Sequence, residues 1–167
     1  MKRMIPLFVV VGIVIAIVLL FFSLATTKRM VVIKEGNLQK IPLEITLHLY
    51  QDSDCGMVIE SLDYASQVVA PDGKTWFFHD HGGFVNWLKD KSFEQEATIW
   101  VMSRDTHRWI DARRATYSQN EITPMGYGFG AYEKPKENSI DFETMRLRVL
   151  HGETLNNPLI RKQILGE

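Results

Sequence analysis

Residues 97–119 read ATIWVMSRDTHRWIDARRATYSQ and carry the clearest fold signal of this sequence. The first part, Ala97 to Ser103, is rich in β-branched and aromatic side chains and predicts a strand. Two shorter stretches, 109–112 and 115–118, predict a further strand with a bend in it. This part of the chain is therefore expected to form strands rather than helices.

The residues before this stretch predict a hairpin and then a helix. Residues 65–69 and 75–78 are strand-like, and the Pro-Asp-Gly-Lys between them at 71–74 is a strong turn signal. In residues 84–91 apolar side chains recur at i, i+3 and i+4, which predicts a short helix with one apolar face. Farther upstream, residues 43–50 alternate apolar and mostly polar side chains and predict another strand.

The residues after it predict a second hairpin and a second helix. A loop rich in proline and glycine at 124–130 leads into a short strand at 129–133. Residues 141–150 predict a helix, with Asp141 as its N-cap. The order of hairpin, helix, strand, and then roughly hairpin and helix predicts an α+β fold of two similar units.

The N-terminal segment is uncharged from Ile5 to Ala25, with Ser23 as its one polar side chain. A helix of this length would span roughly 30 Å, the thickness of a bilayer's hydrocarbon core. We expect a transmembrane anchor or an uncleaved signal at 5–25. The alternative is a cleaved signal peptide, for which Ser23-Leu24-Ala25 fits a cleavage site although the apolar run is long.

The predicted organisation of the whole chain follows from this anchor. Residues 26–42 are expected to be a tether, 43–151 an α+β domain and 152–167 a C-terminal tail. A short tail before a first apolar helix usually stays in the cytoplasm, so we expect a single-pass inner-membrane protein with its soluble domain in the periplasm.

Charge limits the kind of partner that the soluble part can have. The net charge is −1, and leaving out Lys2, Arg3, Lys28 and Arg29 leaves about −5 for the rest. This balance argues against a nucleic-acid partner and favours a cationic ligand or partner.

The sequence DSDCGMVIES at 52–61 contains the only cysteine, Cys55. Met57 lies two residues on, and Gly56 between them lets the chain curve so that both sulfurs can converge. Thiolate and thioether are soft ligands that together select Cu(I) over hard cations. The alternative is that Cys55 is a small buried hydrophobe and that Met57 fills core space.

Two further segments contain candidate ligands. His79-Asp80-His81 could place one or both imidazoles on a metal with Asp80 orienting them. Alternatively, Asp80 caps a helix and both histidines are solvated. Met125, between Pro124 and Gly126, is expected in a loop, either as a soft-metal ligand or partner-facing residue, or tucked over the sheet.

Catalytic motifs are absent from the sequence. It has no phosphate loop, no nucleophile elbow and no HExxH. A small hydrolase or lyase using Asp111 and Cys55 is disfavoured because no activating base is expected beside the thiol. We therefore expect a protein that is not an enzyme.

The combined pattern resembles the NosL family over about residues 54–150. The resemblance is carried by Cys55-Gly56-Met57, by the stretch 97–119 and by PMGYGFGAY at 124–132. It implies two ββαβ-type units and a periplasmic accessory protein that binds Cu(I) and helps to build the copper centres of nitrous-oxide reductase. The same fold occurs in an organomercurial lyase, whose chemistry needs a pair of cysteines that this chain lacks.

Two features depart from the family pattern. Family members are typically lipoproteins, and they carry a histidine several residues after Cys-x-Met, where this chain has Ser61-Leu62-Asp63. A nitrogen ligand would then come from His79 or His81. The leading hypothesis is a membrane-anchored Cu(I) chaperone that uses Cys55, Met57 and Met125 and delivers copper to a metalloenzyme or receives it from a copper exporter. The alternative is a metal-independent assembly module.

Overall fold

The computed structural model describes residues 5–24 and 30–166, with the side chains of the first range described over residues 9–22. Its elements are, in chain order, α1 (Ile5–Leu24), β1 (Ile33–Lys34), β2 (Ser66–Val69), β3 (Thr75–Phe78), α2 (His81–Leu88), the 3₁₀ helix η1 (Glu94–Glu96), β4 (Thr98–Met102), β5 (Trp109–Asp111), β6 (Thr116–Ser118), β7 (Gly130–Tyr132), α3 (Phe142–Leu150) and α4 (Pro158–Leu165).

The predicted N-terminal helix is present as α1. Among the described residues, however, no helix is both long enough and apolar enough to cross a membrane. The anchor expected at 5–25 is therefore not supported by the described residues. The first part of the predicted tether, 26–29, lies outside them.

The main sheet is antiparallel and has the strand order β1-β3-β2-β4-β5. The predicted hairpin pairs Val68 of β2 with Trp76 of β3, and β4 pairs with the other side of β2. The strong strand signal of 97–103 thus becomes an interior strand, because β4 has a neighbour on both sides.

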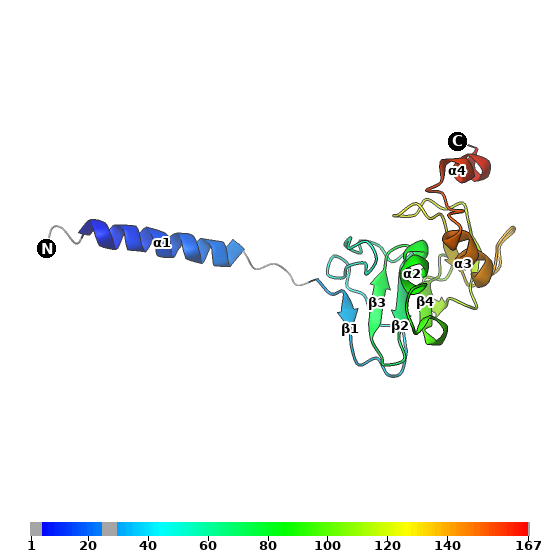
Figure 1. Ribbon diagram of the computed structural model, residues 1–167, viewed down its shortest axis with the longest axis horizontal. Helices are drawn as coiled ribbons and strands as arrows, with labels where there is room; N and C mark the ends of the chain where they lie inside the picture. Colours follow the sequence, from blue (N-terminus) through cyan, green and yellow to red (C-terminus); the bar gives the residue numbers. More distant parts are fainter. Residues whose placement is uncertain (1–4, 25–29, 167) are drawn as a thin grey trace.

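Each face of this sheet has its own cover. Figure 1 shows α2 lying across the sheet, and the core on that side contains Phe84 and Leu88 of α2 with Phe78 of β3. The preceding residue in β3, Phe77, belongs to a separate core with Tyr50. Adjacent strand residues point to opposite faces, so the segment before β2 covers the face opposite α2.

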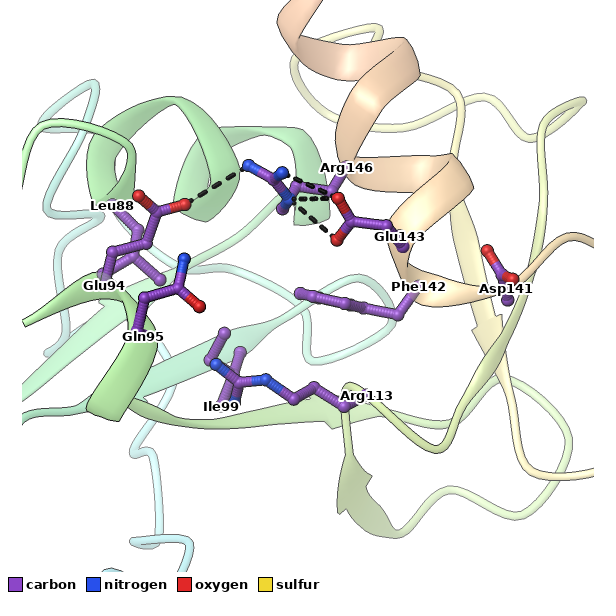
Figure 2. A pocket seen from close by; sticks show the side chains of 9 residues that line it. All are labelled: Leu88, Glu94, Gln95, Ile99, Arg113, Asp141, Phe142, Glu143 and Arg146. Atoms are coloured by element: carbon purple, nitrogen blue, oxygen red, sulfur yellow. Dashed lines mark hydrogen bonds and ion pairs between the residues drawn. The ribbon is translucent and has the colours of Figure 1, made fainter.

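The second unit consists of the β6–β7 hairpin and α3, and it shares the α2-side core through Tyr117, Phe129 and Met145. Figure 2 shows the polar contact that joins the units, in which Arg146 of α3 pairs with Glu143 and with Glu94 of η1. Asp141 caps α3 as predicted, accepting the N–H of Thr144 at 2.8 Å. The second unit therefore packs on the first rather than forming a separate domain.

The α+β class is confirmed, but the second unit differs from a complete ββαβ unit. The first unit has the order β2-β3-α2-β4, whereas no strand follows α3 among the described residues. Part of the tail, α4, is helical instead, and none of its residues is buried.

Residues 43–50 are not a strand, so that prediction is wrong. A side chain replaces the ladder hydrogen bonds there, because the buried Gln67 accepts from the N–H of Leu43 and donates to its carbonyl, both at 2.8 Å. Leu43 and Ile45 still turn apolar side chains toward the core with Phe77. The alternation of apolar and polar residues at 43–50 therefore reflects a loop with one side buried, not a strand.

The described residues assigned to the tether also differ from expectation. β1 pairs with β3 through Ile33 and Trp76. Asn37 is buried and donates to the hydroxyl of Thr75 at 3.1 Å. Residues 31–41 are therefore part of the folded domain.

Candidate metal centre

A tight turn at residues 51–58 presents Cys55. The turn is closed by the N–H of Asp52, which donates to the carbonyl of Met57 at 2.8 Å, and by the N–H of Gly56, which donates to the carbonyl of Asp52 at 3.0 Å. Gly56 has φ of 76°, a conformation that glycine adopts without the cost of a Cβ clash. The sequence prediction that Gly56 curves the chain between the two sulfurs agrees with this geometry.

Backbone pairing with β3 carries this turn to His79. The N–H of Ser53 donates to the carbonyl of Phe77 at 2.8 Å, and the Ser53 hydroxyl accepts from the Phe77 N–H at 3.3 Å. Because side chains alternate along an extended chain, His79 continues the face of Phe77 and meets the turn. The Nδ1 atom of His79 lies 3.9 Å from Sγ of Cys55.

Asp52 is the third member of this group, and its carboxylate is nearly fully buried. Asp52, Cys55 and His79 each offer a possible ligand atom, and these atoms lie within 4.8 Å of one another. We call these three residues the metal cluster.

Hydrogen bonds occupy the Asp52 carboxylate on both oxygens. Oδ1 accepts the N–H groups of Asp54 and Cys55 at 2.8 and 3.1 Å. Oδ2 accepts the His79 N–H at 2.8 Å and contacts His79 Nδ1 at 2.6 Å. Burial alone would raise the pKa of this carboxyl, but the bonds from His79, Cys55 and Asp54 hold the pKa below its usual value. Asp52 is thus an ionised group that fixes both the turn and the imidazole.

The bond to Asp52 determines which His79 nitrogen is free. With Nδ1–H donated to Oδ2, the lone pair for a metal is on Nε2. Among the described residues Nε2 of His79 has no hydrogen-bond partner. This atom also keeps some contact with solvent, because it is absent from the set of fully buried atoms without a partner. A carboxylate on one ring nitrogen and a metal on the other is the usual arrangement of metal-binding histidines.

The Cys55 thiol is partly exposed and protonated without a metal. Burial raises the pKa of Cys55, the N–H of Met57 acts in the opposite direction, and the charges of Asp52 and Asp54 raise the pKa further. Nucleophilic cysteines have the opposite property, a lowered pKa. A bound cation would displace the proton from this thiol.

Met57 lies beside the thiol on the surface. Its N–H donates to Sγ of Cys55 at 3.5 Å, and 47% of the residue is exposed. It also lines a cavity together with His79. The methionine that carries the thioether is therefore on the same turn as Cys55, and the role of Met57 as a ligand stays a prediction.

His81 lies apart from the metal cluster. It is completely buried, its Nδ1 is 2.7 Å from the Ser66 hydroxyl, and its ring packs edge-on against Tyr117. Burial lowers the pKa of His81 to about 3, so this imidazole is neutral. The expectation that His81 supplies a ligand is not supported, because its position at the start of α2 turns it into the core.

Asp80 has the capping role that the alternative prediction gave it, since its side chain accepts the Gly82 N–H at 3.2 Å. The solvated histidines of that alternative are wrong, because His79 and His81 are both buried.

Met125 is half-buried in a loop over the start of α2. Its N–H donates to Oδ2 of Asp80 at 2.9 Å. A Cβ on Gly82 would lie 2.0 Å from the ring of Tyr127, so glycine is what lets this loop approach the helix. The role of Met125 as a metal ligand stays a prediction.

Asp52 was missed by the sequence analysis. The sequence did contain a signal for it. An aspartate side chain often accepts the N–H groups two and three residues further along the chain and so closes a turn, and these are here the N–H groups of Asp54 and Cys55. Its contact with His79, across 27 positions of sequence, had no local signal.

Comparisons with known proteins add little to this geometry. No protein-family model and no curated protein matches the chain. Among solved structures, the copper chaperone NosL from Shewanella denitrificans is similar at 16% identity and a TM-score of 0.49, over 65% of this chain and 87% of that chain. A likeness at this level carries no argument, so the family resemblance of the sequence stays a prediction.

Proposed function

We propose that this protein binds Cu(I) at Cys55 and His79, with Met57 as an additional thioether ligand, and carries it to an acceptor. The carboxylate of the cluster does not coordinate the ion but orients the imidazole. The role is carriage, not catalysis.

The observation that carries this proposal is the saturation of Asp52. Its two oxygens accept four hydrogen bonds from N–H groups of the turn and of His79, and the Cys55 thiol also contacts them. The hard oxygen donor of the cluster is therefore already used. The remaining donors are a thiolate, an imidazole and a nearby thioether, a set that favours Cu(I) over Mg²⁺, Ca²⁺ or Mn²⁺.

The exposure of the site supports carriage rather than permanent storage. Cys55 is partly exposed and Met57 is 47% exposed, so an acceptor can reach the ion. Structural zinc sites differ, since they are usually closed by four protein ligands. The raised pKa of Cys55 also makes copper binding compete with a proton, which weakens retention.

Titration of the reduced full-length chain with Cu(I) against a competing chelator tests the proposal. We expect one ion per chain, loss of binding in Cys55→Ser, and about tenfold weaker binding in Met57→Ala. Met30→Ala, which removes a methionine outside the cluster, is the matched control and should bind normally. Binding that survives Cys55→Ser would refute the proposed site. A parallel titration with Zn²⁺ distinguishes a zinc site.

The acceptor and the location belong to the same proposal. A copper-dependent enzyme or a copper exporter on the outer face of the inner membrane is the partner that the sequence predicts. Cell fractionation with an antibody to the chain tests the location.

A further inference from the structure

A surface cavity of about 530 Å³ opens beside the metal cluster. Its walls come from three separate parts of the chain and include Met57, Val58, Glu60, Tyr64, His79 and Pro124. A water molecule takes roughly 30 Å³ of liquid volume, so the cavity has room for side chains of another molecule, not only for an ion.

One wall of this cavity is a buried imidazole with an unused nitrogen. His79 is 6% exposed and lines the cavity, and its Nε2 makes no hydrogen bond among the described residues. His79 therefore belongs both to the metal cluster and to the cavity wall. The cavity and the proposed copper site share this residue.

The rest of the cavity lining includes apolar side chains and an acidic one. Met57 and Val58 both line the cavity and are 47% and 38% exposed, so they offer apolar surface to a ligand. Glu60 lines the same cavity, and Asp54 lies on the adjoining turn. The Glu60 carboxylate forms no ion pair with a lysine or arginine of residues 30–166, whereas the charge of Lys89 acts on Asp54.

Arg104, which contacts the cavity residue Tyr64, is already paired with acidic side chains. Arg104 stacks over the ring of Tyr64 at 4.7 Å, but its guanidinium is 2.7 Å from Asp63 and 3.7 Å from Glu121. Its charge is therefore matched within its own surroundings. Within the described residues, the cavity wall has one carboxylate, that of Glu60, and no lysine or arginine to balance its charge.

We propose that this cavity is the docking site for a cationic segment of the copper acceptor, which places its own methionine beside the metal cluster. This inference rests on the proposed function and specifies the acceptor's chemistry. A lysine or arginine of the segment pairs with Glu60, and its apolar groups cover Met57 and Val58.

Copper then passes by ligand exchange without a change in oxidation state. A bond forms between Cu(I) and the thioether sulfur of the acceptor. The bonds from Cu(I) to Sγ of Cys55, to the His79 imidazole and to the Met57 thioether break, and the thiolate takes a proton from water.

Transfer of copper from the loaded full-length chain to two synthetic peptides tests this inference. Both peptides contain the same two methionines, flanked by lysines in one and by glutamates in the other. We expect the lysine peptide to remove Cu(I) about tenfold faster at low salt. The ratio should shrink as salt shortens the Debye length from about 30 Å at 0.01 M to about 8 Å at 0.15 M.

Charge variants locate the effect in the cavity. Glu60→Lys should slow transfer to the lysine peptide about fivefold, with Glu60→Gln in between. Glu137→Lys makes the same charge change on an exposed residue that lines a different cavity, and should leave the rate unchanged. Equal rates for the two peptides, or no effect of Glu60→Lys, would overturn the docking site while Cu(I) loading stayed intact. A chain that does not load Cu(I) would refute the proposed function itself.

Discussion

His79 and His81 lie two residues apart, yet they serve different regions of the molecule. His79 follows β3 on the face covered by the turn at 51–58, where Asp52 holds its Nδ1. His81 begins α2 on the opposite face and is buried against Ser66 and Tyr117. The same side chain is a candidate ligand in one place and part of the core in the other, so the tertiary neighbours decide its chemistry.

The burial of His81 should have its largest effect on how the stability of the protein depends on pH. The folded pKa of His81, about 3, lies below the unfolded value of 6.5. Between these values the unfolded chain binds a proton that the folded chain does not, so stability falls as pH falls through 6.5, by about 1.4 kcal/mol per pH unit. Urea unfolding at pH 7, 6, 5 and 4 measures this slope.

His81→Gln is the comparison for that experiment, because it removes the titrating group and keeps a polar side chain. Its stability should fall less steeply between pH 6.5 and 4. Equal slopes for the two proteins would mean that His81 is not held neutral in the core.

Truncation of the buried histidine should have the next largest effect. We expect His81→Ala to lower the free energy of unfolding by about 3 kcal/mol, because it leaves a cavity and an unpaired Ser66 hydroxyl. Chemical denaturation at pH 7 measures the loss. Copper affinity of the folded variant should stay within about threefold of the original, and a greater loss would place His81 in the metal site.

Truncation of His79 should have the opposite result, a large loss of copper affinity and a small loss of stability. His79→Ala should weaken Cu(I) binding about 100-fold, since it removes the nitrogen ligand. Its loss of unfolding free energy should be smaller than that of His81→Ala, because His79 borders a cavity open to solvent. Competition titration and denaturation of both variants give the comparison directly, and unchanged copper affinity in His79→Ala would exclude the imidazole.

The smallest expected effect comes from Asp52→Asn, which keeps the shape of the carboxylate but can present only one acceptor oxygen. We expect about tenfold weaker Cu(I) binding, the lower end of the range for residues that orient a metal ligand. The same titration measures it, with Asp72→Asn, in the β2–β3 turn, as the control for charge. Affinity that rises in Asp52→Asn would show that Asp52 competes with the metal for His79.

Local patterns predicted most of the regular structure. The turn at 71–74 and the strands beside it form as β2 and β3, and Asp141 and Asp80 cap helices. These features depend on nearby residues, so sequence alone contains their cause. The strand expected at 43–50 failed because Gln67, which is distant in the sequence, supplies the hydrogen bonds of Leu43.

The candidate site was predictable only in part, for the same reason. Cys55, Met57 and the glycine between them are one local motif, and the structure places both sulfur-bearing residues on one turn. The sequence could not choose between His79 and His81, since the choice depends on which face of the sheet each one reaches. Asp52 was missed because its bonds to His79 join distant segments.

The donors themselves are local features of the sequence: one thiol, a methionine two residues on and a glycine that turns the chain between them. The imidazole that joins them, and the carboxylate that holds this imidazole, depend on contacts between distant segments. The turn reaches β3 through long-range hydrogen bonds between Ser53 and Phe77. Strand alternation then sends His79 toward the thiol, while the start of α2 turns His81 into the core.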